Sequence, residues 1–475
     1  MRYGILGILV CALLRCVLAQ EPIDPAFDPP MPSSDAPAGK IRWNGSIGIV
    51  IINGQVYQQF GLRPDIPFGK WGVGLDLTFR FDKDGNFKDD EWNDGRDYIE
   101  KLYYLRYGLP GDPLYARVGA LDNVTLGYGI VMRRYSNTIQ YPEIKRIGFY
   151  TEGQQKKFGW QAMINNLGEL DQPGVLAARG SYETKLNRLT LGVTIAHDGN
   201  QFAALHDQDN DGVPDPIDKF PGSNDFARRN QLLDLLDPYE IDSLIDWGYL
   251  PDIRKEPISY KGRKESVTLL GADVGLPVLK GKPVSLWAYA QAAKIVDHGW
   301  GWAFPGARIV VGPLDVGAEY RQYYEEFRGD FFNFVYEIER VQLQNDTFVT
   351  KEKTLEGLGR ATGYYADALL SFANVGYLFS WYEDMHGNAY AGGKTLYGEA
   401  GITPPQLTRL QKLAGYYMEP HVNKLFGKTR TDGTIYGVKL FVGLAQNVAL
   451  VYDHRISYYN GERHRTVRVE TMVTF

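Results

Sequence analysis

Beyond its first 19 residues the sequence contains no cysteine, because Cys11 and Cys16 are the two cysteines of the 475-residue chain. A mature protein that begins after this stretch cannot form disulfides, use a thiolate nucleophile or bind a metal through cysteine. The seven histidines are scattered without metal-ligand spacing. The sequence also lacks a nucleophile elbow and a glycine-rich phosphate loop. We therefore expect a protein that is not an enzyme, although a barrel-shaped lipase or protease could carry its catalytic residues without a linear signature.

A long apolar run is also lacking after the N-terminus, so we expect no membrane-spanning helix. The formal net charge of -6 gives no reason to expect a nucleic-acid partner. Aromatic residues and glycine are abundant instead, with 32 Tyr, 22 Phe, 9 Trp and 53 Gly, yet the mean hydropathy is -0.30. This composition is typical of a membrane β-barrel with a polar interior and large loops.

The N-terminus has the pattern of a secretory signal peptide over residues 1–19. Arg2 supplies the positive charge, an apolar run follows, and the small residue Ala19 precedes the expected cleavage site. Residues 20–40 are rich in Pro, Asp and Ser, which predicts a disordered periplasmic leader. This leader is too short to form the plug domain of an active-uptake barrel.

Alternation of apolar and polar residues with a period of two recurs along the rest of the chain. Such alternation predicts strands with one apolar and one polar face. The clearest examples are 71–82, 124–133, 436–444, 448–456 and 466–475. The last of them ends in Phe475 and resembles the closing strand of bacterial outer-membrane β-barrels, where a terminal Phe is the assembly signal. The resemblance implies a porin-like fold over 41–475 in the outer membrane of a Gram-negative cell, and recognition of Phe475 by the barrel-insertion machinery.

The joints between predicted strands alternate between tight turns and long loops, as in barrels with short periplasmic turns and long outer loops. Counting them gives an all-β, antiparallel transmembrane barrel of about 18 strands, within a range of about 16 to 20. The large outer insertions are 199–263, 328–360 and 385–433. We expect helices at 225–236, 238–247 and 404–413, with the first pair covering the barrel mouth. The topology of 41–97 stays open, because a hairpin at Asn53-Gly54 conflicts with a connection at 83–97.

An acidic motif in the first insertion is similar to the thrombospondin type 3 calcium repeat over about 15 residues. Asp207, Asp209 and Asp211 occupy alternate positions, from which their carboxylates converge on one cation. Gly212 permits the sharp turn after them. The carbonyl of Val213 and the side chains of Asp215 and Asp218 complete the expected Ca²⁺ ligands. We expect the ion to stiffen a large outer loop. The alternative is a solvated acidic loop without an ion.

Charged residues of both signs stand on the predicted inward faces. They are Asp76, Arg80, Arg133, Glu319, Arg321, Lys439, Asp453, Arg455, Arg468 and Glu470. They either line a water-filled constriction or neutralise one another across neighbouring strands. An integrin-type tripeptide, Arg328-Gly329-Asp330, falls in a predicted outer loop, where three-residue matches are common by chance.

These features predict a porin-like channel that passes small polar solutes across the outer membrane. The alternative is a surface barrel, an adhesin, receptor or structural protein, whose calcium-stabilised loops bind a partner or matrix. The expected partners are outer-membrane lipid, the barrel-insertion machinery and small solutes. The transported solute and the oligomeric state cannot be read from the sequence.

Overall fold

The structure is a computed structural model. It describes residues 41–52, 54–88, 91–93, 95–141, 144–169, 174–186, 188–205, 207, 209, 211–214, 217–220, 223–281, 283–344, 346–372, 375–404, 409–427, 430–459 and 462–474. The predicted signal peptide, the predicted leader, Asp215 and Phe475 lie outside these residues. Within the described ranges, no helix is both long and apolar enough to cross a bilayer.

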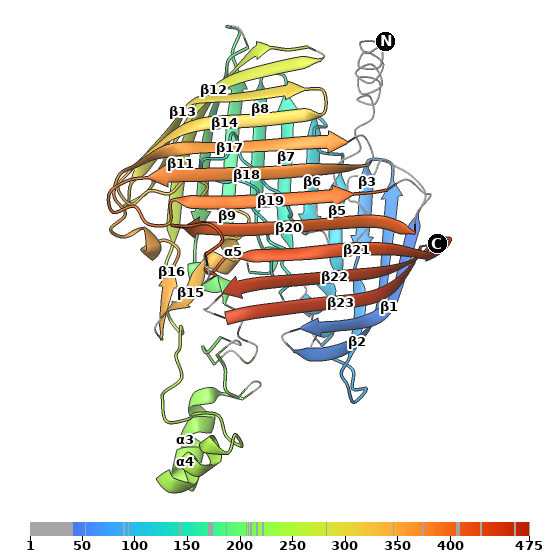
Figure 1. Ribbon diagram of the computed structural model, residues 1–475, viewed down its shortest axis with the longest axis vertical. Helices are drawn as coiled ribbons and strands as arrows, with labels where there is room; N and C mark the ends of the chain where they lie inside the picture. Colours follow the sequence, from blue (N-terminus) through green and yellow to red (C-terminus); the bar gives the residue numbers. More distant parts are fainter. Residues whose placement is uncertain are drawn as a thin grey trace.

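The strands form one large antiparallel sheet that makes up the barrel wall (Figure 1). In chain order they are β1 (Arg42–Ile52), β2 (Gln55–Phe68), β3 (Trp71–Leu75), β4 (Leu77–Phe81), β5 (Leu102–Tyr107), β6 (Leu114–Gly119), β7 (Gly148–Gln155), β8 (Phe158–Ile164), β9 (Val175–Glu183), β10 (Thr190–Asp198), β11 (Val267–Leu279), β12 (Val284–Ile295), β13 (Trp300–Val311), β14 (Leu314–Tyr324), β17 (Ala361–Phe372), β18 (Gly376–His386), β19 (Lys394–Ile402), β20 (Leu410–Val422), β21 (Ile435–Ala445), β22 (Val448–Tyr459) and β23 (Glu462–Thr474).

Smaller elements lie in the connections between these strands. β15 (Val341–Gln344) and β16 (Thr347–Thr350) pair as a separate hairpin. The helices are α2 (Gly95–Ile99), α3 (Asp225–Leu235), α4 (Pro238–Asp246) and α5 (Tyr336–Glu339), with single 3₁₀ turns at Leu167–Glu169, Gln201–Ala204 and Lys353–Leu355.

The barrel is closed and has twenty strands. β1 pairs with both β2 and β23, so the first and last strands complete the ring. β3 and β4 are two halves of one strand, because both pair with β2, on either side of Asp76. The 21-stranded sheet is therefore a ring of twenty. The predicted antiparallel barrel is confirmed, and the preferred count of about 18 is two strands too low.

Two of the missed strands lie in the stretch 385–433, which is predicted from the sequence to be a single outer loop. β19 and β20 cross the barrel wall within it and pair with each other. The outward positions of β19 include Gly398 and Ala400, so its apolar alternation is too weak to recognise. The predicted helix at 404–413 is wrong over 410–413, where β20 begins, and 405–408 lie outside the described residues. A Thr-Pro-Pro sequence fits a turn as well as a helix start.

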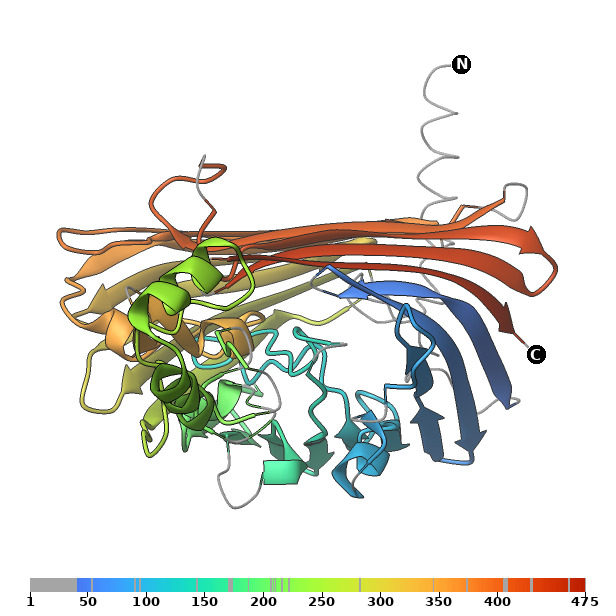
Figure 2. The same ribbon diagram turned by 90° about the horizontal axis from the view of Figure 1, so that it is seen from below.

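The predicted strand 124–133 is also wrong, and this error explains the unresolved topology of 41–97. The segment is buried inside the barrel and takes no place in the wall (Figure 2). Without this strand in the count, every connection that precedes it in the chain moves to the opposite side of the membrane. The β1–β2 hairpin then stands as predicted, with Gly54 at φ +86°, and 82–101 becomes an outer connection.

The outward face of the wall is apolar and the inward face is polar. Large hydrophobic side chains such as Ile47, Val193, Phe304 and Leu378 are exposed on outward positions. An exposed apolar surface around a closed ring of strands requires a lipid environment. The protein is therefore a multi-pass β-barrel of the outer membrane.

Helices α3 and α4 confirm the expectation of two helices in the first insertion. They lie beyond one end of the barrel and away from its strands, and that they cover its mouth stays a prediction (Figure 1). Leu233 and Leu235 of α3 are 37% and 70% exposed. We call residues 223–255 the α3–α4 module.

Candidate functional site

Two chain segments fold into the barrel and meet there. The first, 120–147, follows β6, and the second, 325–360, connects β14 to β17. Met132 and Phe332 form a parallel bridge, and the Asp330 N–H donates to the Ile130 carbonyl at 2.9 Å. We call these the first and second inner segments. Figure 2 shows the coil after β6 inside the ring of strands.

Apolar side chains of the inner segments form a dry core with the barrel wall. One cluster joins Met132, Phe332 and Tyr336, all 0% exposed, to wall residues that include Ala196 and Leu269. A second cluster contains Ile338 of α5 and Val335, the residue just before α5. These two pack against wall residues Trp381, Tyr397 and Met418. At the level of these clusters, the interior of the barrel is packed with side chains.

Buried ion pairs fasten both inner segments to one side of the wall. Arg321 of β14 is fully buried, and its guanidinium bonds Glu383 at 2.8 Å, Glu319 at 3.2 Å and Asp330 at 3.2 Å. Arg133 of the first inner segment pairs with Asp330 at 3.2 Å and with Glu319 at 3.0 Å. Asp330 of the second inner segment is therefore shared by two arginines, one from the wall and one from the first inner segment.

A second buried pair anchors α5 to β10, four strands along the wall from β14. Arg340, directly after α5, bonds both oxygens of Asp198 at the end of β10, at 2.6 and 2.8 Å. Tyr336 donates to Asp198 at 2.7 Å, and Tyr135 of the first inner segment donates to Glu337. Both members of the Arg340–Asp198 pair are almost completely buried, so Asp198 depends on Arg340 for its charge compensation, and Arg340 depends on Asp198 together with Glu337.

A third network lies where the barrel closes. Arg63 of β2 pairs with Asp76 at 3.1 Å and with Glu470 of β23 at 3.2 Å. Tyr141 and Lys145 of the first inner segment also contact Asp76, the ammonium at 3.6 Å. The same carboxylates therefore hold the closing strands together and fix the end of the first inner segment.

The ten charged residues predicted on inward faces all point into the barrel. Arg80 pairs with Glu91, Arg468 pairs with Asp453 at 2.7 Å, and Lys439 lies opposite Asp453 on the neighbouring strand. Arg455 donates to the Ile139 carbonyl at 3.1 Å. Arg133 differs from the expectation in its position, because it belongs to the first inner segment. Each of these charges lies near a polar partner in the part of the chain that the structure describes.

Sequence reasoning missed the residues that hold the inner segments. They are Arg63, Asp198, Asp330, Glu337, Arg340 and Glu383. One signal was available in the stretch from Phe331 to Ile338, which is too apolar for a loop in water. The tripeptide at 328–330 belongs to this segment, and Arg328 and Asp330 are 7% and 5% exposed. An adhesive role for that tripeptide is therefore excluded in this conformation.

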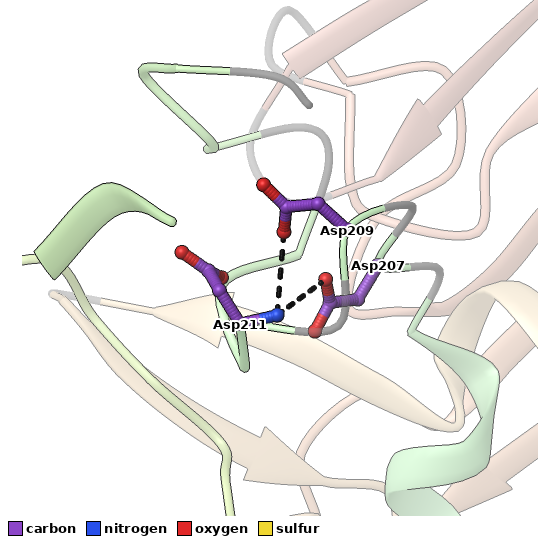
Figure 3. Close-up of side chains that lie close together, drawn as sticks. All are labelled: Asp207, Asp209 and Asp211. Carbon is purple, nitrogen blue, oxygen red and sulfur yellow. Dashed lines mark hydrogen bonds between the residues drawn. The ribbon is translucent and has the colours of Figure 1, made fainter. Parts of the chain in front are cut away.

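Three of the predicted calcium ligands come together in the outer loop. Oxygens of Asp207, Asp209 and Asp211 lie within 4.8 Å of one another (Figure 3). The Asp211 N–H donates to both other carboxylates at 3.2 Å, and Asp211 accepts from the Asp225 N–H at the start of α3. One oxygen of Asp209 is buried without a hydrogen bond. This oxygen is available to a cation, and carboxylate oxygens are the ligands that Ca²⁺ prefers.

The remaining predicted ligands are placed differently. Asp218 lies outside this group of three, and Asp215 lies outside the described residues. Burial, together with a hydrogen bond to the Asp225 carboxyl, raises the pKa of Asp218 to about 7. Burial also raises the pKa of Asp209, to which the neighbouring carboxylates contribute. A divalent cation would relieve this crowding of negative charge.

Comparison with known proteins finds no matching family and no similar curated protein. Solved structures similar to this chain include OpdQ of Pseudomonas aeruginosa, with 10% identity, 92% of this chain and 96% of that chain covered, and a TM-score of 0.31. A BenF-like porin of Pseudomonas fluorescens Pf-5 has 7% identity, coverage of 92% and 98%, and a TM-score of 0.32. The siderophore receptor PirA of Pseudomonas aeruginosa has 10% identity, coverage of 93% and 81%, and a TM-score of 0.35. Because these TM-scores and identities are low, the function of this chain has to be inferred from its own strand pairing and side chains.

The Arg340–Asp198 pair gives a test of how the second inner segment is held. Asp198→Ala leaves Arg340 buried with less compensation, which costs about 3 kcal/mol or more, about a hundredfold in the opening equilibrium. A Val335→Cys reporter, buried at 0% exposure, should then react with a maleimide about a hundredfold faster than in the parent. The control is Glu183→Ala, which breaks the exposed Arg188 pair and should leave the reporter rate unchanged. Equal reporter rates in the Asp198→Ala variant and its parent would show that the pair does not hold the segment.

Proposed function

We propose that the protein is a channel for small polar solutes whose lumen is narrowed by its two inner segments. The observation that carries this proposal is a twenty-strand wall with a charged inner face, into which, among the described residues, loops of the same chain fold. Barrels of about 16 to 18 strands leave an aqueous channel, and barrels of about 22 hold a plug. A barrel that served only as an anchor for surface loops would not need this width.

The way the inner segments are fastened supports passage along them. Besides their apolar cores, the inner segments are held by polar groups such as Asp330 and Glu337. When water enters the barrel it can solvate these groups, so their contacts rearrange at lower cost than the apolar contacts do. Inward charges of both signs favour polar solutes without strong selection for one sign. Small polar solutes, neutral or zwitterionic, fit this lining best.

A second candidate function is supported by the α3–α4 module. Tyr239, Trp247 and Tyr249 are 81%, 70% and 80% exposed there, on a module that projects from the barrel. Exposed Tyr and Trp are enriched at binding hot spots. This feature favours a surface barrel that binds a partner, and such a role does not require conduction.

We further propose that Asp207, Asp209 and Asp211 bind a Ca²⁺ ion, with the Val213 carbonyl, Asp215 and Asp218 as additional ligands. The supporting observations are the convergence of three carboxylates and the free oxygen of Asp209. Since Asp211 also accepts from the first N–H of α3, an ion at this position would stiffen the connection to the α3–α4 module.

Conductance in planar bilayers tests the channel. The wild type should conduct in small steps, and Asp330→Asn should increase the step size or the rate of opening. The reason is that Arg133 and Arg321 both lose the charge that ties the second inner segment to them. The control is Asp234→Asn, an exposed carboxylate of α3 outside the barrel, which should conduct like the wild type. If both the wild type and Asp330→Asn were silent with the barrel shown to be folded, the channel proposal would fail and the binding role would remain.

Limited proteolysis tests the calcium site. Calcium should slow tryptic cleavage at Arg228, Arg229 and Arg254, because it fixes the loop from which the α3–α4 module begins. Asp209→Asn should abolish this protection while keeping the side chain's size, and Asp234→Asn should retain it. The barrel itself should resist trypsin in all of these experiments, since the hydrogen bonds between its strands do not involve the calcium loop. Identical cleavage of the wild type in calcium and in chelator would mean that the motif is a solvated acidic loop.

A further inference from the structure

The lipid-facing surface at the outer ends of β20 to β23 carries basic side chains among tyrosines. On β23 the even-numbered residues Arg468 and Glu470 point into the barrel, so the odd-numbered residues point outward. Arg463 and Arg465 are therefore outward, and both are exposed. They lie opposite Tyr458 and Ile456 of β22, near the outer end of the wall.

Ring contacts join three tyrosines into a strip across β20, β21 and β22, and its last member lies opposite Arg463. Tyr458 lies 6.5 Å from Tyr436, and Tyr436 lies 6.3 Å from Tyr417, measured between ring centroids. Arg430 stacks over Tyr417 at 5.8 Å and donates to its hydroxyl at 3.1 Å. The strip thus has a basic residue at each end. Tyrosines at this position form the aromatic girdle at the boundary between lipid and headgroups.

Among the side chains that the structure describes, no carboxylate neutralises the Arg463 end of this surface. The outward residues of β21 to β23 are Tyr436, Val438, Leu440, Val442, Val448, Leu450, Tyr452, His454, Ile456, Tyr458, Arg463, Arg465, Val467, Val469, Thr471 and Val473. None of them is acidic. Among the side chains that the structure describes, neither Arg463 nor Arg465 lies within ion-pair distance of a carboxylate, whereas Arg430 pairs with Glu419 at 3.2 Å. The Nε2 atom of His454 is buried and makes no hydrogen bond.

A membrane surrounds this face, so the occupant must be lipid or another protein within the membrane. A charged side chain at the lipid boundary is costly unless it reaches the headgroup layer or finds a counter-charge. Arginine reaches that layer with its long stem and bonds phosphate in a bidentate manner. A second copy of this chain fits poorly, because two such faces would bring arginines together, and the nearby carboxylate of Glu419 is already paired with Arg430.

We propose that Arg463 and Arg465, with Tyr458 and Tyr436 beside them, bind the phosphate groups of an anionic lipid of the outer leaflet. These two guanidiniums, at neighbouring outward positions and unpaired among the described side chains, fit a headgroup with two phosphates better than a headgroup with one. The tyrosines flank the headgroup at the girdle, and the apolar positions below them contact its acyl chains. This assignment is independent of whether the barrel conducts.

Lipid binding to the refolded full-length protein in non-ionic detergent, counted by native mass spectrometry, tests the proposal. The probes are a bisphosphorylated glucosamine-disaccharide lipid, phosphatidylglycerol, phosphatidylcholine and inorganic phosphate. The wild type should retain the bisphosphorylated lipid in preference to phosphatidylglycerol, and phosphatidylcholine least. The double variant Arg463→Gln/Arg465→Gln should bind the bisphosphorylated lipid about tenfold or more weakly. Arg463→Lys/Arg465→Lys, which keeps both charges, should recover most of the binding.

The control removes the same number of charges from outer loops in water, as Lys255→Gln/Lys424→Gln, and should bind like the wild type. Heat-modifiable gel mobility checks that each variant is folded. Unchanged affinity in the folded Arg463→Gln/Arg465→Gln variant would overturn the proposal. So would arginine-dependent binding of inorganic phosphate that displaces the lipid, which would indicate a site for soluble anions. A dimer that forms without lipid and dissociates on the same two substitutions would also overturn it, because the face would then bind a second copy of the chain.

Discussion

The arrangement of this barrel depends on the carboxylate of Asp330, which stands between two buried arginines. One of them, Arg321, belongs to the wall, and the other, Arg133, belongs to the first inner segment. A buried charge without compensation costs several kcal/mol, on the order of 3 to 5 when one partner is removed. Glu319 of the wall also pairs with both arginines, and Asp330 is the carboxylate that ties the second inner segment to them. The position of each inner segment therefore depends on the position of the other. A shared carboxylate recurs at Asp76, which pairs with Arg63 of the wall and Lys145 of the first inner segment.

These contacts give the protein a wide barrel with a filled interior. A closed ring of twenty strands leaves more room than its own side chains can fill. The inner segments occupy that room with apolar clusters near their middle and ionic contacts where they meet the wall. Their apolar cores keep them inside the barrel, and their polar contacts determine where they sit. A channel controlled by such segments responds to changes in a few buried charges.

The sequence predicts the barrel well because lipid imposes a simple alternation on each strand. It predicts the filling poorly, since a segment such as 124–133 alternates equally well when its apolar residues face an inner core. β19 was missed for the opposite reason, because glycine and alanine on its outward face weaken the pattern. The inward charges at Arg321, Glu319 and Glu470 could be identified from strand parity. Their partners Asp330 and Glu383 could not, since these contacts join residues that are far apart along the chain or lie in segments without a period.

The outer side of the protein shows a similar division between what local sequence encodes and what the fold brings together. The acidic motif is contiguous, so its three converging carboxylates could be predicted from spacing alone. The basic surface at the outer end of the wall is assembled from β20 to β23 and from the loop at Arg430, and no contiguous motif marks it. Strand register determines which of these residues face lipid, and the sequence alone does not give that register.

The central claim is that two segments distant in sequence meet inside the barrel, and disulfide trapping tests it most directly. Both native cysteines precede residue 20, so a Met132→Cys/Phe332→Cys pair can be introduced without competing thiols in a chain from which those residues are absent. The two positions are bridge partners, and such a spacing suits a disulfide. Mild oxidation of the membrane-embedded protein should join residues 132 and 332 in nearly all molecules, as detected by mass after proteolysis. Two thiols that stay free and react independently with a labelling reagent would contradict this account.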